Sequence, residues 1–201
     1  MPRGTLGRMS DGESPRGQLI VVSGPAAVGK DSLLDRARAV LPALVKSVSM
    51  TTRPRATGEV NGVNYFFVSR DEFLRHRDAD ELLEWASVFD DYYGTPAAWV
   101  RAQRAAGCSV AMNIDVKGGL QVKRLAPDAR LVFIMPPEPR LEVLSRRLHN
   151  RHRDSDTSAA IVKRLETAVW EMEQAPQYDR VIVNDDLDRA AAELIAVIQE
   201  P

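Results

Sequence analysis

The sequence predicts an α/β fold in which a parallel sheet is flanked by helices. Short apolar runs bounded by turn residues alternate with longer segments of helical periodicity, the order typical of a parallel sheet covered on both faces. A glycine-rich turn also follows the first apolar run directly, as in strand–turn–helix units that bind phosphate. The length of 201 residues suffices for one such domain with an ordinary core and small appendages.

Core strands are expected where a short apolar run ends in a turn residue. These runs are Gln18–Ser23, Ser109–Ile114, Arg130–Met135 and Arg180–Val183. Helices are expected where apolar residues recur at spacings of three and four. They are Lys30–Val40, Arg70–Asp78, Pro96–Ala106, Gly118–Leu125, Glu138–His149, Ser158–Gln174 and Leu187–Gln199.

Three segments depart from this alternation. Residues 1–17 are rich in Gly, Pro, Ser and Arg, lack the apolar stretch of a signal peptide and predict a disordered tail. Residues 47–98 are polar, carry most of the aromatic side chains and contain two strand-like pieces, Val48–Thr51 and Asn64–Val68. We therefore expect them to form an insertion between core elements. A second interruption, residues 146–156, is dense in arginine.

The turn after the first expected strand has the spacing G-x-x-x-x-G-K, from Gly24 to Lys30. Glycines let backbone N–H groups turn toward a phosphate, the lysine supplies a positive charge, and the following helix adds its positive N-terminal end. The alternative is an incidental glycine-rich turn. The pattern favours a nucleoside triphosphate, with these residues at its phosphates: Gly24, Pro25, Ala26, Ala27, Val28, Gly29, Lys30, Asp31 and Ser32.

The polar insertion carries a second set of anion-binding side chains. Residues 47–55 combine hydroxyl groups with the guanidinium groups of Arg53 and Arg55, which suit phosphate oxygens. A buried carboxylate such as Glu84 can accept from a ring N–H and an exocyclic amino group at once. We expect Tyr65 and Tyr93 to donate to phosphate and Thr95 to face a carbonyl oxygen.

The overall composition excludes several other kinds of partner. With 27 basic and 28 acidic residues the net charge is −1, so no global field favours nucleic acid or a membrane surface. No apolar run approaches the roughly 20 residues needed to cross a bilayer. The single cysteine, Cys108, excludes an internal disulfide and fits a reducing compartment.

Several strings in this order resemble the guanylate kinase family. They are VSGP…GK, SVS-x-TTR, GEVNGVNYFF, LLEWA, YYGTP, the N-I-D-V-x-G run at 113–118 and VIVNDDLD at 181–188. The resemblance runs from Gly17 to Gln199. It implies the P-loop nucleoside monophosphate kinase fold and phosphoryl transfer from ATP to GMP, and to dGMP. It also implies a domain over residues 18–200, with a core of 18–46, 99–145 and 159–200, a GMP-binding insertion at 47–98 and a lid at 146–158.

The resemblance also implies roles for particular residues. Catalytic groups would be Lys30, Arg53, Arg147, Arg151 and Arg164. Asn184 and Asp185 would join the loop Gly24–Ser32 in binding ATP. GMP would be bound by Ser49, Arg53, Arg55, Tyr65, Glu84, Tyr93, Thr95 and Asp115. Mg²⁺ would arrive with ATP near Asp31 and Ser32. A cytoplasmic location and a homodimer are further expectations from the family.

The chain departs from the family's pattern at several positions. Asp31 replaces the usual Ser or Thr after the lysine, Ala56 occupies an arginine position, and Asn113 stands where the family has an acid. Asp31 is an extra acid beside Lys30, and the acid that the family has at position 113 is replaced by Asn113. We therefore predict that Asp31 contacts Mg²⁺ directly or through water.

Two alternatives remain open from the sequence. The Gly-Lys-Asp-Ser-Leu-Leu run is also similar to ribose 1,5-bisphosphate phosphokinase, although that enzyme needs no guanine-reading carboxylates. The other alternative is a non-catalytic binding module of the same fold. The P-loop lysine and the arginines of the expected lid, which such modules typically lose, are retained here.

Overall fold

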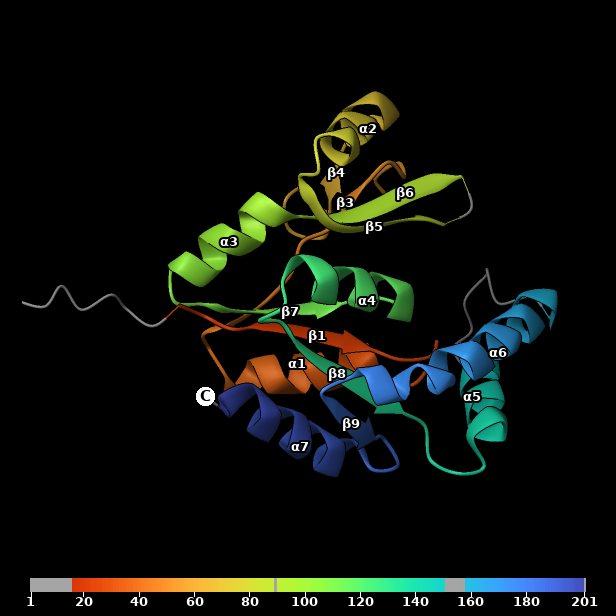
Figure 1. Cartoon of the computed structure of the whole chain (residues 1–201). Helices are drawn as coiled ribbons and strands as arrows, with labels where there is room; N and C mark the ends of the chain where they lie inside the picture. Colours follow the sequence, from red (N-terminus) through yellow and green to blue (C-terminus); the bar gives the residue numbers. More distant parts are fainter. Residues whose placement is uncertain (1–15, 89, 151–157, 201) are drawn as a thin grey trace, which may run out of the picture.

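The computed structural model describes residues 16–88, 90–150 and 158–200. These residues form two β-sheets with helices packed around them (Figure 1). Arg151, most of the expected tail and most of the expected lid lie outside the described residues. None of the helices in the described ranges is both long enough and apolar enough to span a membrane.

The main sheet has five parallel strands in the order β2-β7-β1-β8-β9. They are β1 (Leu19–Ser23), β2 (Leu44–Lys46), β7 (Ser109–Asn113), β8 (Arg130–Met135) and β9 (Arg180–Val183). The α/β prediction is thereby confirmed, as are the four expected core strands to within one residue. Strand β2 is not predicted from the sequence, because a three-residue edge strand is too short to show a periodicity.

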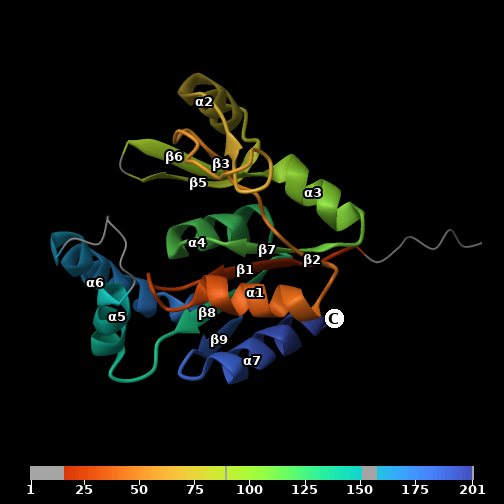
Figure 2. The same cartoon turned by 180° about the vertical axis from the view of Figure 1, so that it is seen from behind.

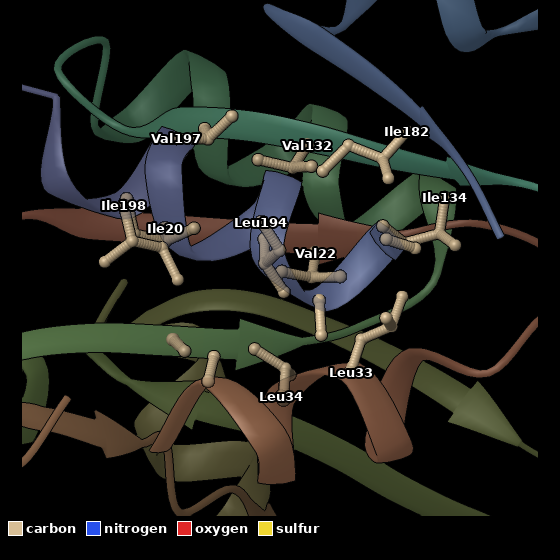
Figure 3. Close-up of a cluster of buried hydrophobic side chains, with 14 of the residues drawn as sticks. Ile20, Val22, Leu33, Leu34, Val132, Ile134, Ile182, Leu194, Val197 and Ile198 are labelled. Carbon is tan, nitrogen blue, oxygen red and sulfur yellow. The ribbon is translucent and has the colours of Figure 1, made fainter. Parts of the chain in front are cut away.

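Helices cover both faces of the main sheet, as Figures 1 and 2 show. On one face Ile20 and Val22 of β1 pack against α1 (Lys30–Val40) and α7 (Leu187–Gln199) (Figure 3). On the other, Leu19 and Val21 pack toward α3 (Ala97–Ala105) and α4 (Val116–Leu125). Successive side chains of a strand point to opposite faces, so a continuous apolar run is what a strand buried on both sides requires.

The second sheet has the order β4-β3-β6-β5 and belongs to the polar insertion. Its strands are β3 (Met50–Thr51), β4 (Phe66–Phe67), β5 (Leu82–Val88) and β6 (Asp91–Pro96), and α2 (Arg70–Asp78) packs Phe73 against it. The hairpin β5–β6 was not expected from the sequence, because its alternation of polar and apolar residues is interrupted by acids and a glycine. In both views α4 lies between the two sheets (Figures 1 and 2).

The remaining elements are α5 (Arg140–His149), α6 (Ser158–Glu173) and a short 3₁₀ turn, η1 (Ala175–Gln177). The expected helix boundaries were off by a few residues at several ends. The helix expected from Glu138 begins at Arg140, and the one expected from Gly118 begins at Val116. In the second case Asp115 caps the helix, because its side chain accepts a hydrogen bond from the backbone N–H of Gly118.

Candidate active site

The glycine-rich loop between β1 and α1 adopts left-handed backbone conformations at three residues. Gly24 has φ 144°, Ala27 φ 63° and Gly29 φ 104°. A side chain at Gly24 would collide with the carbonyl oxygen of Ile134, so this position requires glycine. Left-handed residues are typical of loops whose backbone N–H groups form concave anion sites, and this loop ends at the N-terminus of α1.

The loop borders a cavity of about 350 Å³ lined by Ala26, Ala27, Gly29, Lys30, Asp31, Ser32 and Arg147. Within the loop, Lys30 Nζ donates to the carbonyl oxygens of Gly24 at 2.5 Å and Pro25 at 3.1 Å. Six of the nine loop residues expected at the triphosphate line this cavity, and Gly24, Pro25 and Val28 do not. The lysine side chain is folded over the loop.

Two residues from much later in the chain, Arg147 and Asn184, donate hydrogen bonds to the backbone of this loop. Asn184 is buried and its Nδ2 donates to Val28 O at 2.7 Å. Arg147 donates to Val28 O at 3.2 Å and to Asn184 O at 2.9 Å, and burial lowers the pKa of its guanidinium. Asp185, by contrast, is exposed and forms an ion pair with Arg189, which holds its pKa below the usual range.

Asp31 lies at the first turn of α1 and has two side-chain donors. Its Oδ1 accepts from Lys46 Nζ at 2.9 Å and from Asn113 Nδ2 at 2.6 Å. Partial desolvation raises the pKa of Asp31, but the Lys46 ammonium and the Asn113 amide outweigh it and the pKa falls below the usual value. Asp31 and Asn113, two positions at which the chain departs from the pattern of the family it resembles, are thus in direct contact.

The insertion carries a second cationic site around Arg53. Arg53 Nη2 donates to both carboxylate oxygens of Glu59, at 2.7 and 3.0 Å, and this hydrogen bonding raises the pKa of the guanidinium. The guanidinium carbon lies 5.6 Å from the ring centroid of Tyr65, and Tyr65 contacts Tyr93 edge to face. Arg55 lies exposed on the same loop and interacts electrostatically with Glu59.

A buried carboxylate lies between the two sheets. Glu84 is 6% exposed, and its Oε1 accepts from Thr95 Oγ1 at 2.7 Å, while Thr95 is 3.4 Å from Ser49 Oγ. Burial raises the pKa of Glu84 to about 7, with Asp115 adding to the rise. A Cβ placed on Gly118 would lie 3.3 Å from both Glu84 Oε2 and Asp115 Oδ1, so these two carboxylates border the same space.

A cavity of about 280 Å³ adjoins the loop and is lined by Gly24, Ala26, Lys30, Asn113, Ile114, Asp115, Arg164, Thr167 and Glu171. Glu171 of α6 is 8% exposed, and burial raises its pKa to about 7. Sequence motifs do not point to Glu171 or Lys46, because the neighbours that make these residues notable are distant along the chain. Glu59 lies only six residues from Arg53, but its pairing with Arg53 is seen only in the folded loop.

These features define a class of protein, the P-loop nucleotide-binding proteins. The second cationic site, around Arg53, gives the protein two places for anions, which is the arrangement of a phosphotransferase. Comparison with known proteins makes this specific. The family model described as guanylate kinase matches residues 16–201, and the chain belongs to the guanylate kinase family.

Individual relatives agree with this assignment. The chain is 44% identical over 186 residues to a guanylate kinase of Synechococcus sp. (strain JA-3-3Ab), covering 92% of this chain and 84% of the relative. It is 45% identical over 184 residues to one of Symbiobacterium thermophilum, covering 92% and 85%. The crystal structure of guanylate kinase from Anaplasma phagocytophilum matches with a TM-score of 0.67 at 31% identity, over 92% of this chain and 86% of that one.

Proposed function

We propose that this protein transfers the γ-phosphoryl group of ATP to GMP, giving ADP and GDP. Membership of the guanylate kinase family supports this reaction. The observation that carries it is the buried carboxylate of Glu84 beside Asp115. Guanine offers a ring N–H and a 2-amino group to two acceptors, whereas adenine offers neither at those positions. A bound adenine would leave two carboxylates without donors, which is costly in a buried site.

The donor side holds the triphosphate of ATP. The backbone of the loop from Gly24 to Ser32 and the N-terminus of α1 bind the phosphates, and Lys30 moves from the loop carbonyls onto a phosphate oxygen. Arg147 keeps the loop in place through Val28 and Asn184.

The acceptor side binds GMP through its guanine base and through its phosphate. Glu84 and Asp115 accept from the guanine, and Thr95 fixes the Glu84 carboxylate. The phosphate is bound by Arg53, oriented by Glu59, together with the hydroxyls of Ser49, Tyr65 and Tyr93; the exposed Arg55 lies on the same loop.

Phosphoryl transfer needs little covalent chemistry from the protein. The guanidinium and ammonium groups offset the repulsion between two anionic substrates and hold them in line. Arg147 and Arg164 lie beside the loop cavities and would exclude water when the nucleotides are bound, since water would otherwise accept the phosphoryl group. The role expected for Arg151 stays a prediction, because that residue lies outside the described ranges.

The side chains near the loop fit a divalent metal that arrives with ATP. No group of three or more His, Cys, Asp or Glu side chains that could hold a metal ion occurs among the described residues. Mg²⁺ in such enzymes is held by one or two carboxylates, water and substrate phosphates, so Asp31 and the hydroxyl of Ser32 suffice on the protein side. When bound, the metal neutralises charge on the triphosphate. Replacing Asp31 with serine would then weaken binding of Mg²⁺–ADP relative to ADP alone.

Neither of the other functions finds support. A ribose 1,5-bisphosphate phosphokinase has no need of Glu84 beside Asp115, and a non-catalytic module has no need of Lys30 within a loop that is braced for phosphate. Activity on dGMP, a homodimer and a cytoplasmic location stay predictions from the family.

The test is ADP production from Mg²⁺–ATP with GMP, dGMP, AMP, UMP and ribose 1,5-bisphosphate offered separately. We expect turnover with GMP and dGMP only. Glu84→Gln should lose most of the GMP turnover, since an amide presents a donor where the guanine also donates, and should not gain activity with AMP. Turnover confined to the bisphosphate, or none with any acceptor, would overturn the proposal.

A further inference from the structure

Lys46 stands where the donor and acceptor sides meet. It is the last residue of β2, and the carboxyl ends of parallel strands gather at the edge of the sheet that carries the phosphate loop. Its ammonium group lies 2.9 Å from Asp31 Oδ1, on the first turn of α1. The side chain therefore reaches the donor side from an element next to the insertion.

The same side chain borders the acceptor pocket. Lys46 lines a cavity of about 720 Å³ together with Asp31, Ser49, Tyr65 and Asn113. Burial raises the pKa of Tyr65, and the positive charges of Arg53 and Lys46 oppose that rise, so both cations act on the tyrosine. Ser49 and Tyr65 are two of the residues assigned to the acceptor phosphate, and Lys46 lines the same cavity.

The partner of Lys46 is replaceable. The pair is open to solvent, with 40% of the lysine side chain and 62% of the aspartate side chain exposed, and exposed pairs of this kind are weak. A phosphate monoester carries roughly −1.5 to −2 charges at pH 7, against −1 for a carboxylate. The lysine stem is long and flexible, so its ammonium group can change partners within the cavity.

We propose that Lys46 is a further binding residue for the phosphate of the acceptor, and that it leaves Asp31 for this phosphate when GMP binds. The inference rests on the proposed function, because it takes GMP as the acceptor. Asn113 still donates to Asp31 after the exchange, so the carboxylate stays in position while losing its ammonium partner. Arrival of the acceptor thereby increases the negative charge beside the donor loop, where a divalent cation accompanies ATP.

The first test separates the phosphate from the base. Binding of GMP and of guanosine is measured by calorimetry without ATP or metal for the unchanged protein, Lys46→Gln and Lys46→Arg. Lys46→Gln should weaken GMP binding about tenfold, the scale of a hydrogen bond to a charged group, and leave guanosine binding unchanged. Lys46→Arg should keep most of the affinity. Lys123→Gln, which removes a lysine paired with Asp179 at 3.1 Å, serves as the matched control.

The second test addresses the exchange itself. Asp31→Asn removes the competing charge, so it should tighten GMP binding about threefold in the absence of ATP, the scale of a weak surface pair. The gain should vanish in the Asp31→Asn, Lys46→Gln double variant. Thermal unfolding of each variant monitors the fold.

The outcomes are distinguishable. Equal losses for GMP and guanosine, no loss for either, or weaker GMP binding by Asp31→Asn would overturn the role of Lys46 while leaving the proposed function intact. An unchanged protein that binds guanosine and GMP no better than AMP would overturn the proposed function, and this inference with it.

Discussion

Arg53 and Glu59 form an ion pair in which one guanidinium nitrogen, Nη2, donates to both carboxylate oxygens at 2.7 and 3.0 Å. Glu59 Oε2 also accepts from the backbone N–H of Ala56 at 2.8 Å. Glu59 engages Nη2 alone and Nη1 donates to Pro54 O at 2.8 Å, so the five N–H groups of the guanidinium still include a donor for a phosphate. The carboxylate orients the arginine and at the same time closes the loop that carries it.

Replacing Glu59 with glutamine should therefore weaken the acceptor site while leaving the donor site unaffected. The amide keeps the shape but loses the charge that fixes Arg53, so we expect KM for GMP to rise about tenfold, with KM for ATP unchanged. Steady-state kinetics measure both. Glu72→Gln, which removes a half-buried acid from α2 of the same insertion, is the control, and an equal effect there would contradict the orienting role.

The raised pKa of Glu84, about 7, predicts a pH dependence of base binding. The ionised carboxylate offers two acceptor oxygens to guanine, whereas protonation turns one of them into a donor, so the Kd for guanosine should rise as the pH falls below 7. Guanosine is used because it lacks the phosphate, which titrates in the same range. Calorimetry between pH 5.5 and 8 would show it, and Glu171→Gln should keep the same profile, since Glu171 is not assigned to the base.

The same pKa predicts how Glu84 affects folding. The folded protein holds this proton up to about pH 7, whereas an unfolded chain releases it near 4.5. The contribution of Glu84 to stability is thus fully present below pH 4.5 and lost as the pH rises through 7. Denaturant unfolding of Glu84→Gln should show a higher free energy of unfolding than the unchanged protein at pH 8. A lower value would mean that the ionised carboxylate is well compensated.

Neighbouring glycines of α4 should have separable effects. A methyl group on Gly118 would lie 3.3 Å from Glu84 Oε2 and Asp115 Oδ1, so Gly118→Ala should displace the carboxylates and raise KM for GMP about tenfold. Its effect on stability should stay within about 1 kcal/mol, because alanine favours the helix. On Gly119 the methyl would lie 2.6 Å from the Tyr178 hydroxyl, so Gly119→Ala should cost about 1–3 kcal/mol in unfolding experiments. Equal kinetic effects would contradict the assignment.

Arg147 holds two carbonyl oxygens with two different nitrogens, those of Val28 and Asn184. A lysine has a single ammonium group and cannot reproduce this fork. Arg147→Lys should lower kcat with saturating ATP by about 10²-fold, if the loop must stay fixed in the transition state. Arg146→Lys, at an exposed neighbouring position, is the control and should change kcat little.

The phosphate loop could be predicted from sequence because its determinants are local. Glycine spacing, a preceding apolar run and a following helix lie within one stretch from Leu19 to Val40, and the structure has them in the expected order. Strand β2 has only three residues, too few for a recognisable sequence pattern, and it is held as a strand by its pairing with β7. The hairpin β5–β6 is likewise held by cross-strand pairing, which begins at Leu82 and Pro96.

Sequence motifs predict site residues one segment at a time and do not encode contacts between distant segments. Lys46 and Asn113 are 67 residues apart and meet only because β2 and β7 are neighbours in the sheet, so that both donate to Asp31. Glu171 is one acid in a helix with several polar residues, and its burial against the loop follows from where α6 lies. Such residues become visible only once the tertiary arrangement is known.

The two hydrogen bonds from Lys30 to its own loop have a consequence for the speed of substrate capture. The ammonium group donates to the carbonyl oxygens of Gly24 and Pro25, and these two hydrogen bonds order the backbone of the loop. An incoming triphosphate then has only to exchange one set of hydrogen-bond partners for another, with little conformational entropy left to lose. Association should accordingly depend on encounter and on ionic strength, as in steered reactions, and little on rearrangement of the loop.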